Sequence, residues 1–121
     1  MSLLQATHQD PHRLLVGSWI DVPGDPQRPS RAISTYWPNG LVFFTGYEDA
    51  ECKKPVVRAT GTWRIEGKLL ALKVTLSSNA QRLPVGTRTY DAIAGVSGQR
   101  LLLVSPDGVI QERHRALSCA E

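Results

Sequence analysis

The sequence is poor in the features that mark several large classes of protein. Its 121 residues include two cysteines, one methionine and no apolar run near the ~18 residues that cross a membrane. The 14 basic and 11 acidic residues give a net charge of +3 and are scattered along the chain, without the basic stripe that nucleic-acid binding needs. We therefore expect a protein with no membrane span and no nucleic-acid partner.

Motifs for catalysis and metal binding are also scarce. Of the three histidines, His8, His12 and His114, the first two are four residues apart, but no HExxH arrangement is present and Pro11 lies between them. Gly17-Ser18-Trp19 is not a nucleophile elbow of the Gly-x-Ser-x-Gly type, and neither cysteine has a neighbouring histidine. We predict no metal, no cofactor and no catalytic residue, and hence a protein that is not an enzyme.

Regular alternation of apolar and polar residues is the main positive feature. Apolar residues alternate with polar ones from Val57 to Leu76, on either side of a two-residue turn at Glu66-Gly67. This period of two is typical of a sheet with one face in water. Other turn signals, such as Pro38-Asn39-Gly40 and Pro106-Asp107-Gly108, separate further segments of the same kind. The pattern predicts eight strands, at residues 15–21, 31–37, 41–47, 57–65, 68–76, 85–96, 100–105 and 109–116.

Eight strands joined by hairpin connections predict an all-β fold, an eight-stranded antiparallel up-and-down barrel. Closure of the barrel removes both exposed edges, and an open sheet folded on itself is the alternative. Residues 1–14 hold a start resembling those that expression vectors add, and a short helix with Asp10 as N-cap and Pro11 in its first turn. Residues 15–121 form a single barrel domain.

Strand direction divides the connections between the two ends of the barrel. The loops at residues 22–30, 48–55 and 77–84 gather at one end and the tight turns at the other, so the barrel resembles a cup with a closed base and a mouth.

The same argument places the two cysteines far apart. Cys52 lies in a loop at the mouth, whereas Cys119 follows a strand that ends at the base. A strand of eight residues spans ~26 Å, so we expect two free thiols. Free thiols and the lack of a leader in residues 1–20 slightly favour the cytoplasm, and export is expected if a leader was trimmed.

A series of short motifs occurs in order along nearly the whole chain. They are Leu15-Val16-Gly17-Ser18-Trp19, Tyr36-Trp37-Pro38-Asn39-Gly40, the segment 59–67, Gly86-Thr87-Arg88-Thr89-Tyr90, and Glu112-Arg113-His114-Arg115. The set resembles bacterial lipocalin-like domains, calycin-type β-barrels that open with a Gly-x-Trp motif. This resemblance implies that Trp19 packs at the closed base of the barrel against Arg113 or Arg115. The chain is short for a true lipocalin and lacks a clear C-terminal helix, so the ligand preferences of secreted lipocalins do not carry over.

An eight-stranded barrel can hold one small ligand where its interior residues are small. We predict that a small hydrophobic molecule is bound by residues that face the interior, namely Tyr36, Phe43, Gly61, Trp63, Leu72, Arg88 and Tyr90. If Arg88 and Tyr90 face inward, Arg88 can anchor an acidic head group of the ligand. In the other register of this strand, Thr89 and Asp91 face inward and Arg88 lies in water.

Two other functions stay open at this point. A packed barrel can act as a protein-interaction module or a homodimer through exposed apolar residues, with Ile20, Ile33, Ile93 and Ile110 as candidates. An isomerase or hydrolase can use the same cup, which requires at least two titratable groups that converge inside it.

Overall fold

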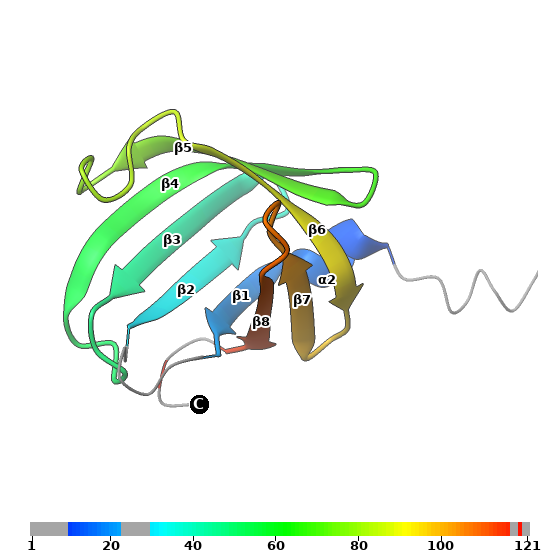
Figure 1. Cartoon of the computed structure of the whole chain (residues 1–121), viewed down its shortest axis with the longest axis horizontal. Helices are drawn as coiled ribbons and strands as arrows, with labels where there is room; N and C mark the ends of the chain where they lie inside the picture. Colours follow the sequence, from blue (N-terminus) through cyan, green and yellow to red (C-terminus); the bar gives the residue numbers. More distant parts are fainter. Residues whose placement is uncertain (1–9, 23–29, 117–118, 120–121) are drawn as a thin grey trace, which may run out of the picture.

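The barrel is closed, as the sequence predicts. A computed structural model describes residues 10–22, 30–116 and 119, and in it eight antiparallel strands follow one another around the barrel until β8 pairs with β1 (Figure 1). The strands are β1 (Gly17–Asp21), β2 (Arg31–Tyr36), β3 (Leu41–Tyr47), β4 (Pro55–Glu66), β5 (Leu69–Ser77), β6 (Arg88–Val96), β7 (Arg100–Val104) and β8 (Ile110–Arg115). The predicted fold class and strand order are confirmed.

A short helix, α2 (Pro11–Leu15), precedes the barrel. The side chain of Asp10 accepts a hydrogen bond from the backbone N–H of His12 at 3.0 Å, and Pro11 stands at the first helical position, so both sequence signals act as expected. Figure 1 shows α2 at the same end of the barrel as the β2–β3 and β4–β5 turns. Residues 5–9 of the predicted helix and 23–29 of the first loop lie outside the described residues.

The β4–β5 hairpin differs from the prediction by one residue. Its turn is Gly67-Lys68 rather than Glu66-Gly67, because Glu66 still pairs with Leu69 across the two strands. Gly67 has a φ of +61°, which is suited to the first central position of a type II′ turn. The shift brings Leu72 opposite Trp63.

Gly61 permits a close approach of β4 and β5. The pairing of the two strands shifts between Thr60 and Gly61, and a Cβ atom at residue 61 would collide with the carbonyl oxygen of Lys73. The sequence suggested that Gly61 leaves room inside the barrel. The structure shows that the absence of a side chain at Gly61 also lets the backbone of β5 approach β4 closely.

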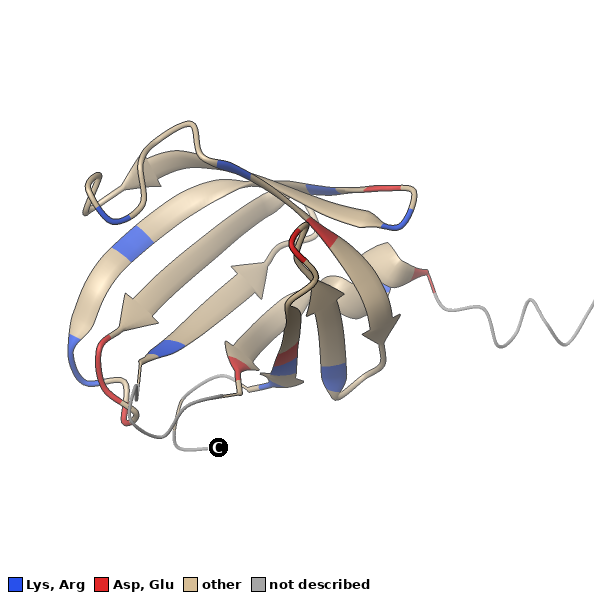
Figure 2. Cartoon of the chain, in the orientation of Figure 1, with Lys and Arg blue, Asp and Glu red and all other residues tan. Residues whose placement is uncertain are grey.

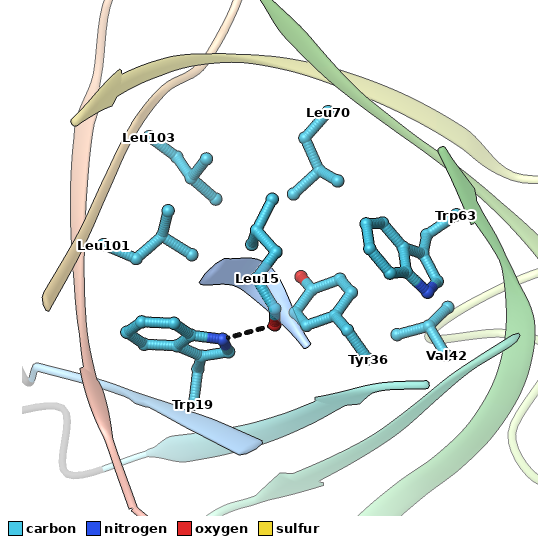
Figure 3. Packing of buried hydrophobic residues seen from close by; sticks show 8 residues of the cluster. All are labelled: Leu15, Trp19, Tyr36, Val42, Trp63, Leu70, Leu101 and Leu103. Carbon is cyan, nitrogen blue, oxygen red and sulfur yellow. Dashed lines mark hydrogen bonds between the residues drawn. The ribbon is translucent and has the colours of Figure 1, made fainter. Parts of the chain in front are cut away.

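The closed half of the barrel is filled by a hydrophobic cluster, which we call the base layer (Figure 3). Leu15 of α2 inserts its side chain among residues from six strands, and its carbonyl oxygen accepts a hydrogen bond from Trp19 Nε1 at 2.9 Å. The members of the base layer are Leu15, Trp19, Tyr36, Val42, Trp63, Leu70, Leu101 and Leu103. Because Leu15 is fully buried there, α2 closes this end of the barrel.

Arg115 is the arginine that stacks on Trp19. Its guanidinium carbon lies 4.0 Å from the centroid of the indole ring. Arg113, two residues earlier on β8, faces the upper part of the interior and forms a hydrogen bond with Gln111. The resemblance left both arginines open as partners of Trp19, and the geometry selects Arg115.

The two cysteines form a disulfide bond, so the expectation of free thiols is wrong. Cys52, in the loop between β3 and β4, is joined to Cys119, and their Cα atoms lie 5.9 Å apart. The sequence argument used a strand of eight residues, but β1 and β8 have five and six residues, about 17–20 Å. The segment from Arg115 to Cys119 can span up to ~14 Å, which brings Cys119 within reach of that loop.

Candidate ligand cavity

A cavity of about 520 Å³ lies within the barrel beside the base layer. Its apolar wall comes from inward-facing residues of β3, β4 and β5, namely Val42, Phe44, Ala59, Leu72 and Val74. Leu83 and Thr87 of the β5–β6 connection and Ser105 and Pro106 after β7 border its outer end. Of the three loops expected at the mouth, the 77–84 loop contributes Leu83, whereas no residue of 48–55 lines the cavity. Residues 23–29 of the 22–30 loop lie outside the described residues.

Polar side chains gather on the opposite side of the same cavity. Asp91 of β6 and Arg113 of β8 both line it, together with Ser34, Thr89 and Gln111. Arg113 Nη2 donates a hydrogen bond to Gln111 Oε1 at 2.9 Å, which fixes the direction of the guanidinium. In the described part of the chain, Asp91 and Arg113 do not form an ion pair with each other. A carboxylate and a guanidinium therefore share one cavity without neutralising each other by direct contact.

The hydroxyl group of Tyr36 lies close to these side chains, but Tyr36 does not line the cavity. The side chain is 1% exposed and its oxygen makes no hydrogen bond with any described residue. Burial raises the pKa of Tyr36, and the nearby guanidinium of Arg113 and the hydroxyl of Ser34 oppose this rise only in part, while Asp91 adds to it. Tyr36 is thus a neutral phenol with a proton to donate at neutral pH.

The pKa of Asp91 also departs from that of an ordinary aspartate. Asp91 is 9% exposed, and burial raises the pKa of its carboxyl group, while the charge of Arg113 opposes the rise. A perturbed titratable group that lines a cavity is a common feature of functional sites. Asp91 and Arg113, with Ser34, are therefore the candidate site within the cavity, and we call them the polar cluster.

The ligand-binding residues predicted from sequence fall into three groups in the structure. Gly61 and Leu72 line the cavity. Tyr36 and Trp63 belong to the base layer, where Trp63 stacks on His12 at 4.4 Å between ring centroids. The others, Phe43, Arg88 and Tyr90, have side chains on the outer face of the barrel.

The positions of these outward residues follow from strand pairing. Phe43 is 41% exposed and alternates with Val42 and Phe44, which face the cavity. On β6, Asp91 is opposite the buried Leu70, so Asp91 faces inward and its neighbour Tyr90, 36% exposed, faces outward. Arg88 and Tyr90 border the cavity because β6 forms part of its wall. The side chain of Arg88 is exposed on the outer face, so it does not anchor a ligand inside the barrel.

The residues that sequence reasoning missed are the polar ones. Asp91 was named only as part of the other register of its strand, and Arg113 only as a partner of Trp19. One sequence signal was available for Arg113, since it alternates with the outward Glu112 and His114 and shares its parity with Arg115. No signal in the sequence pointed to Ser34, which lies between two β-branched residues on β2.

Several other kinds of site have no support in the described residues. They contain no group of three or more His, Cys, Asp or Glu side chains placed to hold a metal ion. Within residues 10–22 and 30–116, no helix has the length and apolar character needed to cross a lipid bilayer. Figure 2 shows basic and acidic residues scattered over the strands and loops rather than gathered in a patch of one sign.

Comparison with known proteins adds no further assignment, since neither family models nor curated proteins match this chain.

Proposed function

We propose that this protein is a non-enzymatic, lipocalin-like barrel that binds one small, largely apolar molecule in its cavity. The observation that carries the proposal is the cavity of about 520 Å³ inside a closed barrel. Ligand pockets commonly occupy ~300–1,000 Å³ and combine an apolar wall with a few polar groups, and this cavity has both. The Gly-x-Trp motif and the stacking of Arg115 on Trp19 support the resemblance to lipocalin-like domains.

The partial filling of the barrel argues against a packed interaction module. The base layer fills one half of the interior and the cavity occupies the other. Of the isoleucines suggested for an outer apolar patch, Ile20 is buried and pairs with the half-buried Ile33 across β1 and β2. Ile93 packs against the base layer, and Ile110 is exposed. These side chains do not form one patch, so a ligand site is better supported than a homodimer through them.

The polar cluster decides whether a catalytic function is supported. Asp91 and Arg113 both line the cavity, which meets the condition of at least two titratable groups inside the cup. However, Tyr36 has no hydrogen-bond partner and Asp91 forms no ion pair with Arg113, so no acid–base pair is assembled. Binding without turnover fits this arrangement better.

The disulfide bears on where such a protein works. Bonds between cysteines persist in oxidising compartments and are rare in the cytosol. The Cys52–Cys119 bond therefore favours an extracytoplasmic location in this proposal, in place of the cytoplasm that two free thiols suggested.

The proposal is tested by filling the cavity from inside. Ala59 faces it from β4, whereas Thr62, on the same strand, is exposed on the outer face. We expect 2-methylnaphthalene, followed by its own fluorescence, to bind the wild type and the Thr62→Leu control, and to bind Ala59→Leu at least tenfold more weakly. Native mass spectrometry of the purified wild type should in addition show a bound small molecule that is released unchanged. Equal binding by both variants, or no binding by any form, would sink the proposal.

A further inference from the structure

We propose that the ligand carries a neutral polar group with both a hydrogen-bond donor and an acceptor, such as a carboxamide, held between Asp91 and Arg113. This inference rests on the proposed function, because it names the chemistry of the molecule that fills the cavity. It assigns the apolar body of that molecule to the wall of Phe44, Leu72 and Val74.

The charges of Asp91 and Arg113 are the main argument. Asp91 accepts hydrogen bonds and Arg113 donates them, and both line the cavity without forming an ion pair. A group that bridges them needs a donor directed at Asp91 and an acceptor directed at Arg113. A carboxamide has both within one planar group.

The balance of charge argues against an ionic ligand. The carboxylate of Asp91 and the guanidinium of Arg113 cancel, and the cationic side chains of Lys73 and Arg88 are exposed on the outer face of β5 and β6. An acidic head group would pair with Arg113 but face Asp91, and a basic one would face Arg113. The acidic head group expected from the sequence depended on an inward Arg88, which the structure does not provide.

Four probes with one aromatic body separate these cases. They are 2-naphthamide, 2-naphthoic acid, 2-naphthylmethylamine and 2-methylnaphthalene, each titrated by naphthalene fluorescence at neutral pH. We expect 2-naphthamide to bind at least tenfold more tightly than each of the other three.

The outcomes distinguish failure of this inference from failure of the proposed ligand-binding function. Equal affinity for 2-naphthamide and 2-methylnaphthalene would overturn the inference but leave the binding function intact, as would tightest binding of the acid or the amine. Should no probe bind the wild type, the proposed function itself fails. A double variant, Asp91→Leu with Arg113→Leu, removes both charges together and should abolish the preference for the amide without leaving either charge unpaired.

Discussion

Arg115 holds three separate segments together while it stacks on Trp19. Its guanidinium donates to the carbonyl oxygens of Val16 at 2.6 Å and Leu14 at 2.7 Å, and its Nε donates to Gly98 at 3.1 Å. Helix α2, the start of β1 and the β6–β7 turn therefore meet at one side chain on β8. A side chain on Gly17, whose φ is +120°, would collide with this guanidinium, which gives a physical reason for the glycine of the Gly-x-Trp motif.

Replacement of Arg115 should destabilise the closed end of the barrel. Arg115→Ala removes the stacking on Trp19 and three hydrogen bonds to carbonyl groups, and we expect the free energy of unfolding to fall by about 3 kcal/mol. The exposed Arg64 provides the control, since Arg64→Ala should change it by less than about 0.5 kcal/mol. Urea unfolding followed by tryptophan fluorescence measures both, and equal effects would contradict the role given to Arg115.

Gly61 should tolerate no side chain. A Cβ atom there would collide with the backbone of Lys73, and backbone yields less readily than a side chain. We expect Gly61→Ala to lower the free energy of unfolding by at least about 2 kcal/mol. Gly95 on β6 has open space around its Cβ position, so Gly95→Ala should cost less than about 1 kcal/mol. Thermal unfolding of the two variants makes the comparison, and a stable Gly61→Ala would disprove the close approach.

The disulfide should contribute strongly to stability. The bond closes a loop with a sequence separation of 67, and its removal should lower the free energy of unfolding by about 4 kcal/mol on the chain-entropy account. We expect the purified, unreduced protein to show no reactive thiol in denaturant and to lose stability after reduction. Two thiols per chain without reductant would show that the bond does not form.

Asp91 should make stability fall as pH rises. Because folding raises the pKa of this carboxyl group, its ionisation is less favourable in the folded chain than in the unfolded one. Its contribution is complete below the ordinary pKa of an aspartate and declines as pH rises through the raised value. Asp91→Asn removes this decline, so the variant should gain stability relative to the wild type between acid and neutral pH. Unfolding measured across that range checks the sign, and a relative loss on going to neutral pH would refute it.

The architecture was readable from the sequence because it depends on local signals. Alternation of apolar residues, Pro38-Asn39-Gly40 and the capping of α2 by Asp10 each act within a few residues, and the observed elements follow them closely. The single-residue error at Gly67-Lys68 arose because both Glu66-Gly67 and Gly67-Lys68 place a glycine in a two-residue turn.

The interior was less readable because it depends on pairing between strands. On β6, the two alternating faces are nearly equal in polarity, with Arg88, Tyr90 and Ala92 against Thr89, Asp91 and Ile93. Only the pairing of Asp91 with Leu70 decides which face is inside. The disulfide was not predicted for a related reason. The short strands and the position of Cys119 beside the β3–β4 loop are properties of the folded chain, which the sequence does not show.

The interior of the barrel is divided between the packed base layer and the cavity beside it. Ala59 lines the cavity and is not part of the base layer, whereas Leu72 lines the cavity and also packs against that layer. Substitutions at Ala59 can therefore reshape the cavity while the base layer stays intact. Such a scaffold is suited to laboratory evolution, in which libraries vary the wall and the polar cluster over a constant foundation. Under the proposed function, the range of molecules that such variants accept is set chiefly by the residues of the cavity wall.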